Sequence, residues 1–164
     1  MIAMLMASVL LIQPSQPSVP RLRPTTDVAR ELVAFAMTRS PTIKRLVREL
    51  EASDLFVYVE VKHNIGDAPA ETVFLVANNA GRFLRVTIDA RLEPRRRIEL
   101  LGHELRHAME IADAPGVRDA AGMRRLFSDI GWSLRRSLAY ETEAAVQAER
   151  QVTRDLAVKS GAGF

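Results

Sequence analysis

The order of the predicted elements places this 164-residue chain in the α+β class. Two segments with the apolar spacing of a helix come first, a block rich in β-branched and aromatic residues follows, and helical spacing then returns. Hydrophobic residues make up 48% of the chain, which is enough to bury a core. We therefore expect a single domain with N-terminal helices, a small mostly antiparallel sheet, a long helix and a C-terminal helix.

The first 24 residues differ from the rest of the chain. Residues 1–12 are almost wholly apolar and uncharged, and residues 13–20 are rich in Pro and Ser. About a dozen apolar residues match the central region of a signal peptide and are too few to span a bilayer as a helix. We predict that residues 1–24 are an export signal or a short membrane-associated segment outside the fold, and that residues 25–164 form the domain. The protein is then exported or held at a membrane.

Start signals define the two N-terminal helices. Thr25 or Thr26 can cap a helix whose apolar spacing continues to about Met37. Ser40 can cap a second helix, with Pro41 at its first position. Both helices are expected to bury one apolar stripe.

Three segments have the composition of β-strands. Residues 55–61 and 71–76 are rich in β-branched and aromatic residues, and residues 82–88 alternate polar with apolar side chains. The turn-forming residues 78–81 separate the last two segments. We therefore expect these two segments to form an antiparallel hairpin.

The second half of the chain has a helical pattern. A long helix is predicted from Pro94 to the residues before Pro115, and a short helix over residues 117–127. Gly131 interrupts the pattern, and a last helix is expected over residues 138–158.

The predicted long helix contains the sequence H-E-x-x-H, formed by His103, Glu104 and His107. Residues four apart project from the same face of a helix, so the two imidazoles can bind one Zn²⁺ at about 2.0–2.1 Å. Glu104 lies one step around the helix and can act as the general base toward a water that the ion activates. The alternative is a pair of surface histidines on a charged helix.

A third protein ligand must come from a carboxylate. The chain has no cysteine and no histidine after His107, which excludes thiolate sites, disulfides and a third downstream imidazole. Glu141 and Glu143 lie near the start of the predicted last helix. The helical period places Glu141 within the apolar stripe, where a carboxylate is costly unless it is paired or bound to metal. We take Glu141 as the third ligand and keep Glu143 as the alternative.

The H-E-x-x-H sequence with a glutamate on a later helix resembles the gluzincin branch of the zincin metallopeptidases. The resemblance implies a zinc-dependent hydrolase of peptide or protein substrates, with an edge strand before the metal helix that binds extended peptides. Residues 82–88 occupy that place in the sequence. Many gluzincins carry an Asp four residues beyond the ligand glutamate, whereas here Ala145 follows Glu141 and Gln147 follows Glu143 at that distance. The Gln147 spacing favours Glu143, so the choice between the two glutamates stays open.

Two other classes of protein fit parts of the sequence. A non-catalytic domain could use the same zinc ligands to hold two helices together. A basic binding module would agree with the net charge of +3 and the pI of about 9.8. However, the basic residues are mixed with acidic ones along the chain and do not alternate with aromatic residues, so we expect no nucleic-acid partner.

Overall fold

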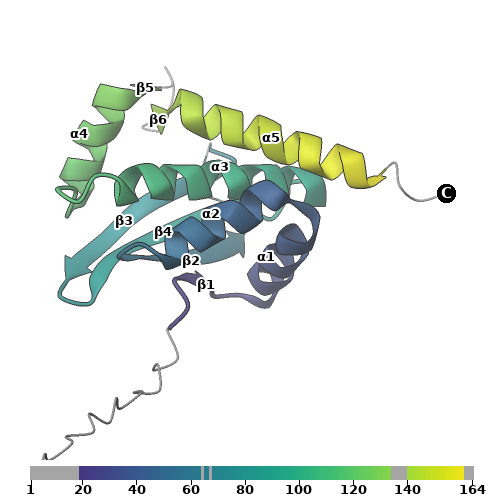
Figure 1. Cartoon of the computed structure of the whole chain (residues 1–164), viewed down its shortest axis with the longest axis horizontal. Coiled ribbons are helices and arrows are strands. Elements are labelled where there is room, and N and C mark those ends of the chain that lie inside the picture. Colours follow the sequence, from purple (N-terminus) through teal and green to yellow (C-terminus); the bar gives the residue numbers. More distant parts are fainter. Residues whose placement is uncertain (1–18, 64, 67, 134–139, 161–164) are drawn as a thin grey trace, which may run out of the picture.

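The computed structural model describes residues 19–63, 65–66, 68–133 and 140–160, and confirms the predicted α+β class (Figure 1). The predicted export or membrane segment lies mostly outside the described residues. Among those that are described, no helix is both long enough and apolar enough to cross a membrane. The elements are β1 (Leu22–Pro24), α1 (Asp27–Arg39), α2 (Pro41–Glu51), β2 (Leu55–Lys62), β3 (Ala70–Asn78), β4 (Gly81–Asp89), α3 (Pro94–Ala112), α4 (Ala120–Ile130), β5 (Trp132–Ser133), β6 (Tyr140–Glu141) and α5 (Glu143–Ser160).

Side-chain caps explain where several helices begin. The hydroxyl of Thr26 accepts the Ala29 amide at the start of α1, and the hydroxyl of Ser40 accepts the Ile43 amide at the start of α2. Both helices therefore begin as predicted. The two C-terminal helices begin later than predicted, because Asp119 caps α4 and Thr142 caps α5.

The main sheet is mixed. Its strand order is β1-β2-β4-β3, with β1 and β2 parallel, β2 and β4 parallel, and β3 antiparallel to β4. The predicted β3–β4 hairpin is confirmed, but the expectation of mostly antiparallel pairing is wrong for two of these three pairings. The reason is that β4 lies between β2 and β3, which run in opposite directions. Because β4 is antiparallel to β3, it is parallel to β2.

Strand β1 extends the fold toward the N-terminus. Leu22 is buried in the core and is paired with Val57, and the Arg21 amide donates to the Glu51 carboxylate at 3.0 Å. The folded part therefore begins before residue 25, and the predicted boundary at residue 24 is too late. A three-residue strand is too short to give a periodic signal in the sequence.

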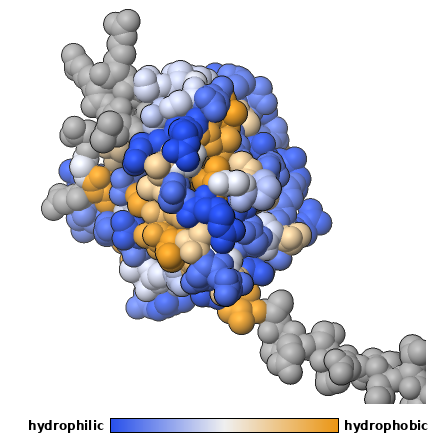
Figure 2. Space-filling view, turned by 90° about the vertical axis from the view of Figure 1, so that its left-hand side faces the viewer, coloured by the Kyte–Doolittle hydropathy of each residue, from blue (hydrophilic) through white to orange (hydrophobic). Residues whose placement is uncertain are grey.

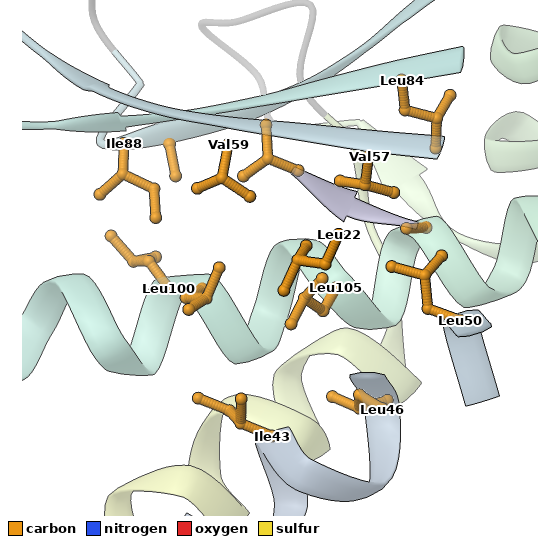
Figure 3. Packing of buried hydrophobic residues seen from close by; sticks show 14 of the residues in the cluster. Leu22, Ile43, Leu46, Leu50, Val57, Val59, Leu84, Ile88, Leu100 and Leu105 are labelled. Carbon is orange, nitrogen blue, oxygen red and sulfur yellow. The ribbon is translucent and has the colours of Figure 1, made fainter. Parts of the chain in front are cut away.

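Helix α3 lies at the centre of the domain and is buried from Ile98 to Ile111, apart from the half-buried Arg106. Figure 3 shows Leu100 and Leu105 facing the sheet residues Val57 and Val59, with Ile43 and Leu46 of α2 beyond the helix. Helix α5 also packs against α3, and Figure 1 shows the two helices running side by side. A helix that is enclosed in this way has no solvent-exposed face for its polar residues.

The edge of the sheet next to α4 is β3, whereas β4 is an interior strand. The expectation that residues 82–88 form the edge strand is therefore wrong. Because β3 doubles back along β4, it takes the outer position, and no strand of the described residues pairs with its far side.

Arg82 joins the start of β4 to the end of α3. Its side chain is 1% exposed and lies on the inner face of the sheet, where alternation with Leu84 and Val86 would place an apolar residue. Its guanidinium donates to Asp54 at 2.7 and 2.9 Å. It also donates to four carbonyl oxygens at and beyond the end of α3, those of Ile111, Ala112, Ala114 and Val117. A cation here satisfies the free carbonyls and the negative end of the helix dipole.

We expect Arg82→Met to lower the free energy of unfolding by about 3–5 kcal/mol, because it leaves several buried carbonyls without a donor and removes the partner of the half-exposed Asp54 carboxylate. Urea denaturation of the variant measures the loss. Arg45→Met changes an exposed arginine of α2 and should stay within about 0.5 kcal/mol of the wild type. Equal stabilities for the two variants would contradict the role assigned to Arg82.

Candidate metal centre

A cavity of about 490 Å³ brings the predicted site residues together. It lies between α3, the edge strand β3, α4 and β6, and His103, Glu104, His107 and Glu141 all line it. The other walls are mainly apolar and include Val73, Phe74, Met123 and Phe127. Figure 2 shows the end of the molecule that carries α4 and the β3–β4 hairpin, where apolar residues gather on a largely hydrophilic surface.

Both histidines of the H-E-x-x-H sequence are buried. His103 is 4% exposed and His107 is 5% exposed, and their rings meet edge to face with centroids 4.8 Å apart. This burial contradicts the alternative of a surface pair on a charged helix. Buried imidazoles need defined hydrogen-bond partners, and both rings have them.

His103 lies between two carboxylates that come from other elements. Its Nδ1 is 3.1 Å from Oε2 of Glu149 on α5, and its Nε2 is 3.6 Å from Oε2 of Glu141 on β6. Arg96 forms an ion pair with Glu149 and thereby holds that carboxylate beside the ring. With Nδ1–H donated to Glu149, the Nε2 atom keeps the lone pair that faces Glu141.

His107 is oriented through a chain of two hydrogen bonds. Its Nδ1 is 2.9 Å from Oε2 of Glu110, and the Thr142 hydroxyl donates to the other oxygen of Glu110 at 2.7 Å. The same hydroxyl accepts the Ala145 amide and so caps α5. The start of α5 and the orientation of His107 therefore depend on one side chain.

Glu104 points toward β3. The Thr72 hydroxyl donates to its Oε2 at 2.6 Å. Burial raises the pKa of the Glu104 carboxyl, and the nearby carboxylates of Glu141 and Glu71 add to this effect against the opposing influence of His107. A raised pKa makes this carboxylate a stronger proton acceptor than a carboxylate in water.

The two histidines are perturbed in opposite directions. Burial and the adjacent His107 lower the pKa of His103 to about 4, which keeps its ring neutral. Burial also opposes charge on His107, but the hydrogen bond to Glu110 and the carboxylates of Glu104 and Glu141 outweigh it and raise the pKa of His107. The pair therefore accommodates one positive charge rather than two.

Glu141 reaches the cavity from a short strand and not from a helix. The prediction that the last helix begins at residue 138 is wrong, since Glu141 pairs with Trp132 in the β5–β6 ladder and α5 begins at Glu143. Gly131 permits this pairing, because a Cβ there would lie 2.2 Å from the Glu141 carbonyl oxygen. Glu143 is exposed, accepts a hydrogen bond from Gln147, and does not line this cavity.

The donor atoms fit a zinc ion in their chemistry and partly in their spacing. Two ligands of a tetrahedral zinc lie about 3.3–3.5 Å apart, close to the 3.6 Å between Nε2 of His103 and Oε2 of Glu141. Among the described residues, however, no three or more His, Asp or Glu side chains are gathered into a complete ligand set. The structure thus brings the expected ligands to one cavity without assembling all of them around a point.

A close approach of two helices places Glu149 beside His103. Gly102 precedes His103, and a Cβ at position 102 would lie 2.6 Å from Cγ2 of Val152 on α5. Only a residue without a side chain lets α5 approach α3 at this point, three residues after Glu149. The packing of these helices therefore helps to set the geometry of the site.

Several residues of the site escape a search for sequence motifs. Glu110 follows His107 at the helical i,i+3 spacing, and Thr142 followed by Glu143 is a typical helix start, so local signals existed for both. Glu149 falls between Ala145 and Val152 on the apolar stripe of the last helix, which marks it as a carboxylate that needs a partner. Thr72 carries no such signal, because its contact with Glu104 depends on tertiary packing.

Comparisons of the chain with protein-family models, with curated proteins and with solved structures find no match. A fold class alone does not define an activity. The residues of the site and their chemistry are therefore the features that can indicate the function of this protein.

We expect Gly102→Ala to lower the free energy of unfolding by about 1–3 kcal/mol, because the added methyl group overlaps Val152. Val152→Ala alone should cost about 1–3 kcal/mol, because it empties a fully buried position. In the double variant the new methyl group occupies the vacated space. Its loss in urea denaturation should be at least about 0.5 kcal/mol smaller than the sum of the single losses. Strict additivity would show that the two positions do not compete for space.

Proposed function

We propose that this chain is a zinc-dependent metallopeptidase that hydrolyses peptide bonds. His103, His107 and Glu141 are the proposed zinc ligands, and Glu104 is the proposed general base. The observation that carries the proposal is the pair of buried imidazoles, each of which engages a carboxylate through Nδ1.

Carboxylates at Nδ1 are the usual outer partners of metal-binding histidines. A Glu149 or Glu110 oxygen at Nδ1 fixes the ring tautomer, orients Nε2 and makes it a stronger electron donor. Both rings line the cavity that also holds Glu141 and Glu104. The two carboxylates satisfy Nδ1 of each ring and leave Nε2 as the atom that would bind the metal.

Zinc would supply Lewis-acid polarisation of the substrate carbonyl and activation of water at neutral pH. Glu104 takes the proton from the attacking water and delivers it to the leaving amine. The Thr72 hydroxyl holds the Glu104 carboxylate in one orientation for both transfers. The apolar cavity wall excludes bulk water from this exchange and strengthens its electrostatic interactions.

The position of β3 supports a peptide or protein as the substrate. This strand borders the cavity through Glu71 and Phe74, and its outer edge is unpaired in the part of the chain that the structure describes. An extended peptide can add to such an edge through backbone hydrogen bonds, which places its own carbonyl groups beside the site. This role belongs to β3 in place of the residues 82–88 expected from the sequence.

We expect about one zinc per chain in the reconstituted protein, and loss of that zinc in His103→Ala and in Glu141→Ala, because each change removes a ligand. Elemental analysis after exhaustive dialysis measures the content. Glu143→Ala is the matched control and should retain its zinc, since Glu143 faces solvent and bonds to Gln147. Zinc lost in Glu143→Ala and kept in Glu141→Ala would exchange the roles of the two glutamates. A wild-type chain that takes up no zinc would overturn the proposal.

Glu104→Gln should keep the zinc and lower kcat for peptide hydrolysis by on the order of 10²–10⁴-fold, because the amide cannot accept a proton. Turnover of a quenched fluorescent peptide library measures the loss. This variant also separates catalysis from a purely structural zinc site, the second class considered for this chain. A structural site predicts no hydrolysis by the wild type and no effect of the change beyond stability.

A further inference from the structure

The face of the sheet that points away from the helices carries a cluster of arginine and aromatic side chains. Helices α1, α2 and α3 pack against the other face, toward which Val57, Val59 and Leu84 point (Figure 3). Side chains alternate between the faces of a strand, so the neighbours of these residues face outward. We call the outward cluster the arginine–aromatic face, which consists of Arg21, Arg23, Phe56, Tyr58, Phe83 and Arg85.

The strand register assembles this face from three distant parts of the sequence. Arg23 of β1 is aligned with Tyr58 of β2, which is aligned with Arg85 of β4. The next outward row pairs Phe56 with Phe83. Basic and aromatic residues that are separate along the chain therefore alternate in space, a pattern that the sequence alone does not show.

The aromatic rings hold the guanidinium groups flat against the sheet. The guanidinium carbons of Arg21 and Arg23 lie 4.1 and 4.2 Å from the centroid of Phe56, and Phe56 stacks on Phe83 at 4.9 Å. Cation–π contacts of this kind fix the arginines without neutralising them. Arg23 donates its Nε to the Pro20 carbonyl at 3.0 Å and its Nη1 to the Tyr58 hydroxyl at 3.2 Å. A guanidinium group has five N–H donors, so others remain for a ligand.

The charge of these arginines is not balanced by carboxylates. No side-chain ion pair joins Arg21, Arg23 or Arg85 to an Asp or Glu among the described residues, whereas Arg30, Arg82, Arg91 and Arg96 have such pairs. The Glu51 carboxylate accepts the backbone amide of Arg21 rather than its side chain. Nη1 of Arg21 and Nε of Arg85 are buried and have no hydrogen-bond partner there. The nearest outward row further along the strands is acidic, with Glu60 and Glu71, so the positive charge is concentrated at one end of the sheet.

We propose that the arginine–aromatic face docks on anionic lipid headgroups at a membrane surface. Guanidinium groups bind phosphate oxygens through their N–H donors. Val76, which is 50% exposed and aligned with Phe83, adds an apolar side chain at the rim of the same face. The rings are already covered by each other and by the guanidinium groups, which disfavours the alternative of stacking with nucleic-acid bases.

The position of the face along the chain supports a membrane as the partner. Arg21 follows the apolar residues 1–12 after the short segment 13–20. Eight residues span at most about 28 Å when fully extended. An apolar segment held at a bilayer would therefore keep this face close to the headgroups. Lipid docking is independent of the proposed peptidase activity, because none of these residues lines the candidate metal centre.

The test compares the binding of the full-length chain to phosphatidylcholine vesicles with and without about 30% phosphatidylglycerol. The variant R21Q/R23Q/R85Q should lose on the order of 100-fold in affinity for the anionic vesicles, or about fivefold per arginine, and keep its affinity for the neutral ones. The matched control K44Q/R45Q/R48Q removes the same charge from exposed positions of α2 and should bind like the wild type. The apolar segment is present in all three proteins, so its contribution cancels.

Equal binding of the wild type to both kinds of vesicle would overturn the proposal, as would an equal loss in the two triple variants. A further outcome is that a single-stranded oligonucleotide displaces the protein from the anionic vesicles at a phosphate concentration below that of the lipid. That result would overturn the proposal in favour of a nucleic-acid partner. If thermal unfolding shows that R21Q/R23Q/R85Q does not fold, Arg23→Gln alone and the salt dependence of wild-type binding decide. Docking then predicts about a fivefold loss for Arg23→Gln and weaker binding as salt increases, and the absence of either would reject it.

Discussion

The burial of α3 is the constraint on which the rest of this structure depends. The helix is enclosed by the sheet on one side and by α2 and α5 on the other, yet it carries several ionisable side chains that are largely withdrawn from bulk water. A buried polar group is stable only when it has partners, and here several of the partners come from other parts of the chain. Thr72 of β3 is hydrogen-bonded to Glu104, and Glu149 of α5 to His103. Thr142, which caps α5, is hydrogen-bonded to Glu110. Assembly of the domain therefore also assembles the candidate site.

The end of α3 and the start of α5 are stabilised in the same way. Arg82 satisfies the carbonyls at the end of α3, and Thr142 satisfies an amide at the start of α5. Each of these side chains also reaches across to another element, Asp54 in the first case and Glu110 in the second. Helix ends and tertiary contacts are thus stabilised together, which ties the geometry around His107 to the fold as a whole.

Local patterns in the sequence predict much of this arrangement. The caps at Thr26 and Ser40, the β3–β4 hairpin and the spacing of His103 and His107 depend on residues close together in the chain, and the structure has each of them. Glu141 lines the cavity, as its prediction as a zinc ligand requires. That prediction places it on the last helix, whereas α5 begins two residues later, at Glu143.

What the sequence does not predict depends on pairings between distant segments. The parallel alignment of β2 with β4 follows from which strands become neighbours, and strand β1 is too short to have a recognisable period. Arg82 is buried on a face where alternation predicts a core residue, because a helix end that needs hydrogen-bond donors happens to lie there. The contact of Glu149 with His103 likewise requires the close packing of α5 on α3 at Gly102.

The double role of Thr142 limits what evolution can place at that position. Its hydroxyl accepts the Ala145 amide and donates to Glu110 at the same time. Aspartate is as good a helix cap as threonine in general, but when ionised it offers no hydrogen to donate and would set a second negative charge against Glu110. Alanine would leave both partners unsatisfied. Among common helix caps, serine preserves the full set of contacts, so a position that looks like an ordinary helix start is expected to drift very little among descendants of this protein.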